Sequence, residues 1–166
     1  GSAPDCLLYH YDGNAFGYRN VSNDVRFIEN AVLTNCTQGT QGEVQRMTDN
    51  DMVQVTGLSF TTTGSKCLLV HDSDPTGTDY TGYYWETTAA DVAAFPCDET
   101  TATNVTVYDA SDTVQAIVPP AATGDSLIEI RMINISLSGA LADDATVTKQ
   151  LETTVRIRNN RVITAP

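Results

Sequence analysis

Short segments in which apolar and polar residues alternate, separated by turn residues, recur along the chain and constrain its fold more than any other feature. Residues 53–61 are a clear example, because Val53 and Val55 alternate with polar neighbours before the pattern meets Gly57. Alternation with a period of two places successive side chains on opposite faces of a strand. We therefore expect a mainly β fold, a β-rich α+β arrangement of antiparallel sheets or a sandwich with short helices.

The alternation also predicts which side chains point inward. In residues 53–61 we expect Val53 and Val55 to be buried, followed by Leu58 and Phe60 after a bulge at Gly57, because a bulge changes the phase of a strand.

Two later segments carry the same kind of pattern. Residues 127–137 form one expected strand, in which apolar residues beginning at Ile128 and Ile130 alternate with Glu129 and Arg131 and the phase slips near Ile133. Such a slip is typical of a second bulge.

The segment 153–162 predicts Val155 and Ile157 inward and Arg156 and Arg158 outward. Residues 88–95 are the expected site of a short helix, which ends before a proline.

The chain is the right size for one domain. Its 166 residues contain no repeat, low-complexity tract or linker. Residues 1–4 read as an expression remnant and lead-in, so we expect one domain over residues 5–166. A domain of this length buries roughly 70% of its unfolded surface and need not depend on disulfides to fold.

The charge distribution excludes one large class of partner. The formal net charge is −12, and no lysine or arginine occurs between Lys66 and Arg131. Arginines gather instead near the C-terminus, at Arg156, Arg158 and Arg161. Because nucleic-acid binding depends on basic side chains that neutralise phosphates, we expect no DNA or RNA partner.

Four cysteines are spaced widely along the chain, at Cys6, Cys36, Cys67 and Cys97. Zinc sites usually contain closely spaced pairs, and the chain has none. An even number of distant cysteines favours two disulfides in an oxidising compartment. Three connectivities are possible, of which we prefer Cys6–Cys36 with Cys67–Cys97, because each pair brackets a local strand unit.

Nothing in the sequence predicts a catalytic site, a cofactor or a small-molecule substrate. His10 and His71 are the two histidines available as a general base, and both lie at strand ends beside acidic residues. Nucleophile-elbow and glycine-rich phosphate motifs are absent. A pair of carboxylates as in glycosidases stays open, because many acidic residues always allow two to meet. We expect a binding or assembly protein rather than an enzyme.

A weak calcium site is the one metal possibility. Asp72, Asp74 and Asp79 supply alternating carboxylates around Gly77. The segment lacks the distal glutamate of a calcium loop. We favour a solvated acidic turn, and predict no metal.

Aromatic residues gather at Tyr80, Tyr83, Tyr84 and Trp85. Flat rings with polar tips suit a surface that contacts carbohydrate or protein, although about half of the group is expected in the core. Tyr83, Tyr84 and Trp85, with Arg156 and Arg158, are therefore the candidate partner contacts.

Several segments, in this order, resemble the soluble domain of PilW-like minor pilins. Residues 6–13 resemble the family's opening strand, residues 45–49 with 53–60 resemble a central "T-D … L-x-F" run, and residues 133–139 with 154–159 resemble its closing strands. Residues 67–124 have no counterpart. One departure is that Val44 or Gln45 stands where the family often has tryptophan.

The resemblance implies a subunit of a type IV pilus or a type II secretion pseudopilus that lacks catalytic residues. Such proteins carry an N-terminal apolar helix, cleaved and methylated by prepilin peptidase, that anchors them in the inner membrane and is absent from this chain. The implied partners are other minor pilins and the major pilin, with which the subunit initiates or caps the filament. The implied location is the periplasmic face of the inner membrane and later the pilus, at its tip.

A free-standing extracellular adhesin or carbohydrate-binding β-sandwich is the alternative. A conventional signal peptide in the natural protein would favour it.

Overall fold

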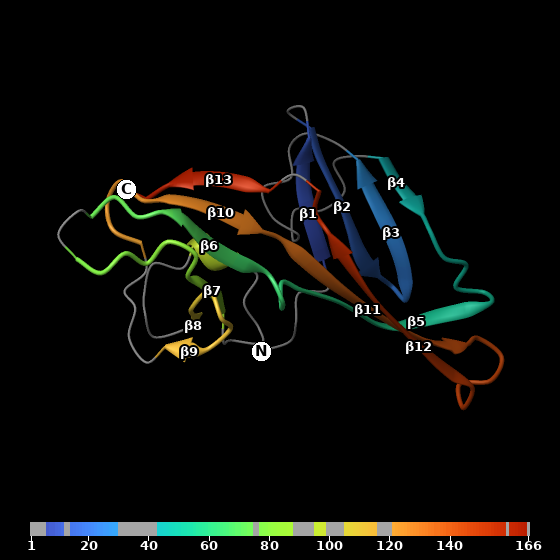
Figure 1. The fold of residues 1–166 in the computed structure, drawn as a ribbon. Coiled ribbons are helices and arrows are strands. Elements are labelled where there is room, and N and C mark those ends of the chain that lie inside the picture. The colour runs from blue at the N-terminus through green and yellow to red at the C-terminus, as the bar shows by residue number, and fades with distance from the viewer. Residues whose placement is uncertain are drawn as a thin grey trace. The chain divides into compact units, whose positions relative to one another are not determined.

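The computed structural model (Figure 1) describes residues 6–11, 14–29, 43–74, 77–87, 95–98, 105–115, 121–158 and 160–165. Contacts within the chain divide it into two compact units. Unit 1 contains residues 1–60 and 134–153, and unit 2 contains residues 61–133 and 154–166. Each unit is described by itself below.

Unit 1 begins with a sheet of four consecutive antiparallel strands: β1 (Cys6–Tyr11), β2 (Asn14–Val21), β3 (Asp24–Glu29) and β4 (Glu43–Arg46). Two residues separate β2 from β3, and both Ser22 and Asn23 have positive φ. Positive φ at both central residues matches the type I′ turn that joins tightly paired strands. This turn fixes the β2–β3 register.

One face of this sheet packs through a glycine. Leu8 lies opposite Gly17, which lies opposite Ile28. A Cβ atom at Gly17 would lie 2.5 Å from the Leu7 backbone oxygen and 2.7 Å from Leu8 Cδ2. The missing side chain therefore leaves room for Leu8 to pack against the buried Ile28.

A second sheet has the strand order β12-β11-β5, formed by β5 (Val53–Thr61), β11 (Met132–Leu141) and β12 (Thr148–Arg156). Most of each strand belongs to unit 1, and the unit boundaries fall inside all three. The division therefore coincides with no linker or change of composition, which is why the sequence gives no sign of it.

The burial of β5 largely follows the predicted pattern. Val55, Leu58 and Phe60 are buried, so the inward phase changes at Gly57 as expected. Val53 differs from the prediction, because it is 40% exposed. In unit 1 a backbone hydrogen bond from Val55 N–H to the Asn23 carbonyl oxygen links the two sheets.

Unit 2 contains a six-stranded antiparallel sheet in the order β13-β10-β6-β7-β8-β9. Its strands are β6 (Lys66–His71), β7 (Tyr84–Thr87), β8 (Val105–Tyr108), β9 (Val114–Gln115), β10 (Ser126–Ile130) and β13 (Arg161–Thr164). Among the described residues of this unit, the core is an apolar cluster of buried residues: Cys67, Leu69, Trp85, Val107, Leu127 and Ala165.

The described residues contain no α-helix. They include one 3-10 turn, η1 (Pro96–Asp98), and no helix of the length and apolar character needed to cross a membrane. Most of the helix expected at residues 88–95 lies outside the described residues. The fold is therefore β-rich as predicted, and the described residues contain none of the short α-helices that were expected.

The segment predicted as one strand at residues 127–137 is divided. β10 ends at Ile130 and β11 begins at Met132, in a different sheet. The inward phase of β10 is also opposite to the prediction, because Leu127 and Glu129 are buried while Ile128 and Ile130 are partly exposed. The neighbouring strand explains this, since Glu129 pairs with the fully buried Cys67 and shares its face.

The segment predicted at residues 153–162 is divided as well. β12 ends at Arg156 and β13 begins at Arg161, again in different sheets. Val155 is 46% exposed rather than inward, because all of β12 is exposed. Arg156 and Arg158 are exposed, as predicted.

One complete disulfide is described, where two were expected. Cys67 in β6 is bonded to Cys97 in η1, which is one of the two preferred pairs. Cys6 also belongs to a disulfide. Cys36 lies outside the described residues, so the pairing Cys6–Cys36 stays a prediction.

Candidate interaction surfaces

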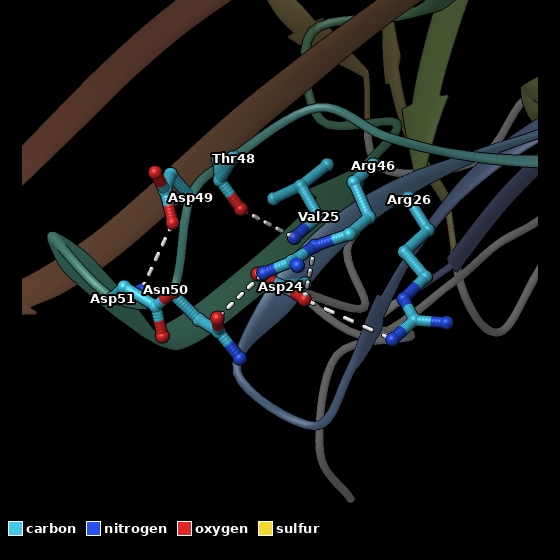
Figure 2. A network of polar contacts seen from close by, with 8 residues as sticks. All are labelled: Asp24, Val25, Arg26, Arg46, Thr48, Asp49, Asn50 and Asp51. Carbon is cyan, nitrogen blue, oxygen red and sulfur yellow. Dashed lines mark hydrogen bonds and ion pairs between the residues drawn. The ribbon is translucent and has the colours of Figure 1, made fainter.

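A polar network in unit 1 surrounds a buried carboxylate at the start of β3 (Figure 2). Asp24 is 1% exposed. Its Oδ2 lies 3.1 Å from Arg46 Nε and 3.8 Å from Arg26 Nη2. Arg46 also donates to Asn50 in the turn after β4, and Val25 N–H donates to Thr48 Oγ1 at 3.0 Å. The network therefore holds the turn that follows β4 against β3.

Three arginines form a row across this sheet. Arg19 in β2 is directly opposite Arg26 in β3, which is directly opposite Arg46 in β4. Like charges in direct cross-strand pairs destabilise a sheet unless they are compensated. Asp24 supplies that compensation for Arg26 and Arg46, which explains why a carboxylate is retained in a buried position.

The opposite face of the same sheet carries an aromatic surface, formed by Tyr9, Phe16, Tyr18 and Phe27. The ring centre of Phe16 lies 5.6 Å from that of Tyr9 and 6.2 Å from that of Phe27, and these rings are nearly parallel. The ring centres of Tyr18 and Phe27 are 5.2 Å apart. Tyr9 is 41% exposed and the other three are half-buried. Burial raises the pKa of Tyr9, and nearby Tyr18 and Glu29 raise it further. The face thus presents flat apolar rings with phenolic tips, the chemistry expected of a contact surface.

The predicted aromatic contacts in unit 2 are divided between core and surface. Trp85 is 3% exposed, and its indole N–H donates to the Pro96 carbonyl oxygen at 3.1 Å. It belongs to the core and is not a surface contact, because its strand turns this side chain toward Cys67 and Val107. Tyr83 packs edge-on against Tyr80 and is half-buried.

Tyr84 lies on the other face of β7. Its ring stacks on Tyr108 at 5.0 Å, and Lys66 Nζ lies 4.3 Å from the ring centre. The hydroxyl donates to Asp112 Oδ1 at 2.6 Å, a hydrogen bond that raises the pKa of Tyr84. Tyr84 remains a contact candidate whose orientation is fixed by these neighbours.

In the weak calcium candidate, the carboxylates of Asp72 and Asp79 accept hydrogen bonds from backbone N–H groups of the same segment. Asp72 accepts the N–H groups of Asp74 and Tyr80. Asp79 accepts the Thr81 N–H, which lowers the pKa of Asp79. Within the part of the chain that is described, no group of three or more His, Cys, Asp or Glu side chains could hold a metal ion.

The two histidines are not brought into a catalytic group by the described contacts. His71 is exposed at the end of β6, and the side chain of His10 lies outside what the structure describes.

A buried glutamate in unit 2 was not predicted from the sequence. Glu129 is fully buried. Its Oε1 accepts the Cys97 N–H at 3.2 Å, and its Oε2 lies 3.7 Å from Arg161 Nη1. Cys67 and Arg161 are its two cross-strand neighbours. The carboxylate therefore joins the disulfide turn to β13, and the strand pairing that creates this site has no local sequence signal.

The aromatic surface and the row of arginines in unit 1 were also not predicted from the sequence. The signal that could have found them is turn length, because the two-residue connection 22–23 fixes which side chains of β2 and β3 are opposite each other. Applied to Phe16 and Arg26, this register would have placed the aromatic residues of these strands on one face and the arginines on the other.

One comparison with known proteins identifies a family. A family model described as prepilin peptidase-dependent protein B matches residues 1–157. Searches of curated proteins and of solved structures found no match.

Proposed function

The chain belongs to the prepilin peptidase-dependent protein B family, and we propose that it is a minor pilin or pseudopilin subunit that helps initiate or cap a type IV pilus-like filament. The observation that carries the proposal is the match of that family over residues 1–157. Membership supports a pilin-related protein in general and does not single out the PilW-like group that the sequence motifs resemble.

The proposed mechanism is assembly through protein contacts, without catalysis or a cofactor. An apolar N-terminal helix, which the resemblance to minor pilins implies, would anchor the subunit in the inner membrane and then pack in the filament. The β-structured part would recognise neighbouring subunits from the periplasmic side and later from the filament tip. Its candidate contacts are the aromatic surface of unit 1 and the exposed Arg156 and Arg158.

The family name suggests a direct test of processing. We expect the natural full-length protein to be shortened by prepilin peptidase when the two are co-expressed in bacteria, and to keep its leader when a catalytically inactive peptidase is used. Gel mobility and N-terminal sequencing measure the difference. A product identical in both strains would contradict the proposal.

A second test addresses the contacts. Other minor pilins of the same organism are captured with the full-length protein carrying Arg156→Glu and Arg158→Glu. We expect their recovery to fall, because exposed charges at an interface mainly control complementarity and association rate. The matched control, Arg156→Lys with Arg158→Lys, keeps the charges and should keep the recovery. Equal recovery with the glutamate variant would exclude these arginines as contacts.

Carbohydrate binding by a free-standing adhesin is a second candidate, favoured by the aromatic surface. Nearly parallel rings such as Phe16 and Phe27 offer the flat apolar face on which sugar rings can stack. The test is binding to a panel of immobilised glycans, with Tyr9→Ala as the variant and Val114→Ala, which shortens an exposed apolar side chain of unit 2, as the control. Loss with Tyr9→Ala alone would favour this candidate, and no binding to any glycan would remove it.

A further inference from the structure

An exposed strand edge in unit 1 has no described partner on one side. In the order β12-β11-β5, β12 is an end strand, and no other described strand pairs with its outer edge. All nine of its residues are exposed. The backbone donors and acceptors of an end strand can form a ladder with another extended chain.

An apolar groove lies beside this edge. It has a volume of about 360 Å³ and is lined by residues of all three strands, including Val53, Leu137, Leu141, Val147 and Leu151. Leu141, Val147 and Leu151 are 44%, 49% and 63% exposed. Exposed apolar groups gathered at one place mark an interaction site more often than the same residues scattered singly.

The floor of the groove is closely packed where β11 meets β5. A Cβ atom at Gly139 would lie 3.1 Å from Val53 Cγ1 and 3.2 Å from the Gln54 backbone oxygen. The absence of a side chain at Gly139 therefore keeps β11 and β5 close together and the groove open above them.

The sequence of β12 lacks several of the usual protections of an end strand. Natural proteins commonly protect such strands with proline, a bulge or charged residues, above all lysine. Residues 148–153 contain no proline or glycine, and their centre is the exposed Leu151. Two charges are present, on Lys149 and Glu152.

We propose that β12 pairs antiparallel with β12 of a second copy of this chain, about a two-fold axis at Leu151. With a two-fold axis perpendicular to the sheet, both copies have the same face on the same side. Two residues that lie directly opposite each other are then equally far from the axis, measured along the strands. Leu151 then faces Leu151, Gln150 faces Glu152, and Lys149 faces Thr153.

The neighbouring registers are less favourable. An axis at Glu152 would place two carboxylates directly opposite each other, which destabilises a sheet. An axis at Gln150 would place each Leu151 opposite Lys149. The axis at Leu151 avoids both arrangements and brings the two apolar residues together.

The sequence of β12 can therefore pair antiparallel with a second β12. This self-complementarity favours a second copy of the chain over an unrelated protein as the partner at this edge. Each chain carries a net charge of −12, so long-range repulsion opposes the pairing. Salt screens such repulsion, and the dimer should become more stable as ionic strength rises. This inference does not rest on the assembly function proposed above.

Sedimentation equilibrium of the intact chain tests the proposal. We expect a monomer–dimer equilibrium that shifts toward dimer at higher salt. Leu151→Arg places two like charges at the axis, and we expect its dissociation constant to rise at least about a hundredfold. The matched control is Val162→Arg, an exposed apolar residue on the end strand β13 of unit 2, which should leave the equilibrium unchanged. Circular dichroism verifies that both variants are folded.

The register is tested with added cysteines under mild oxidation. Directly opposite Cβ atoms lie about 4.5–5.5 Å apart, close to the span of a disulfide, so Leu151→Cys should give a covalent dimer. With Thr153→Cys the two new thiols lie about 13 Å apart along the strands and should give none. A wild-type chain that is monomeric up to millimolar concentration, a dimer unaffected by Leu151→Arg, or equal cross-linking by both cysteine variants would overturn the proposal.

Discussion

Replacing both Cys67 and Cys97 by alanine removes the bond that ties η1 to β6 in unit 2. The bond closes a loop with a sequence separation of 30. A cross-link stabilises the folded chain mainly by restricting the unfolded one, and the loop-closure relation for this separation gives about 3.6 kcal/mol at 25 °C. Cys67 is fully buried, so the missing sulfur also leaves a small cavity. We expect the free energy of unfolding to fall by about 3–5 kcal/mol.

Urea unfolding followed by tryptophan fluorescence measures this loss. Trp85 is the one tryptophan of the chain, is 3% exposed, and pairs in register with Cys67. Its emission therefore reports on the packing around the disulfide. With a slope of about 1–3 kcal/mol/M, a loss of 4 kcal/mol lowers the urea midpoint by at least about 1 M. The slope should rise slightly, because the unfolded chain without the cross-link exposes more surface.

The control is Val114→Ala, which shortens a 60% exposed side chain in β9 of the same sheet and should change stability by less than about 0.5 kcal/mol. Reducing the wild-type protein is not equivalent, because Cys6 also belongs to a disulfide. A midpoint lowered by less than about 0.3 M at an unchanged slope would refute the loop-closure reasoning.

Three further predictions concern individual side chains. Gly17→Ala should destabilise unit 1 by about 1–3 kcal/mol in urea unfolding, because the new Cβ would meet a β1 backbone oxygen at 2.5 Å. Gly57→Ala is its control, since the nearest atom there is 3.7 Å away, and equal losses would contradict the argument. Asp24→Ala should cost about 1.5–3 kcal/mol, because the half-exposed Arg46 guanidinium loses its charged partner but can still be solvated, and an unchanged thermal midpoint would exclude this role. Asp109 accepts two backbone N–H groups of its turn, which lowers its pKa. The carboxylate therefore stabilises the fold above the pKa that Asp109 has in the unfolded chain, and this contribution is lost as the pH falls through its pKa in the folded chain. An NMR titration of the Asp109 carboxyl carbon measures the folded pKa, and an ordinary value would contradict the prediction.

Much of the strand content could be predicted because alternation and turn chemistry are local. The change of phase at Gly57 and the Cys67–Cys97 bond are both present in the structure as expected. The abundance of Val, Ile, Thr and Tyr and the scarcity of Lys, Arg and Glu likewise indicated a β-rich protein before any contact was known.

The orientation of several strands could not be predicted, because a period of two is compatible with either face inward. In β10 the sequence favours Ile128 inside, yet pairing with β6 and β13 buries Glu129 and supplies it with Arg161. Burial of a carboxylate is favourable only when such partners exist, and these come from distant parts of the chain.

The candidate contact surfaces depended on tertiary structure for the same reason. Trp85 looked like a surface residue among tyrosines, but its strand faces the core. Tyr9 and Phe27 are far apart in sequence and meet on one face only because three strands align in register.

The sequence by itself therefore determined that this chain is an acidic, cysteine-containing, β-rich protein of a pilin-related family. Tertiary structure alone decided which face of each strand is buried, which charges compensate one another, and that β12 is an exposed end strand. The physical reason is that propensity and alternation act between neighbours in the chain, whereas burial and strand order depend on residues that only the fold brings together.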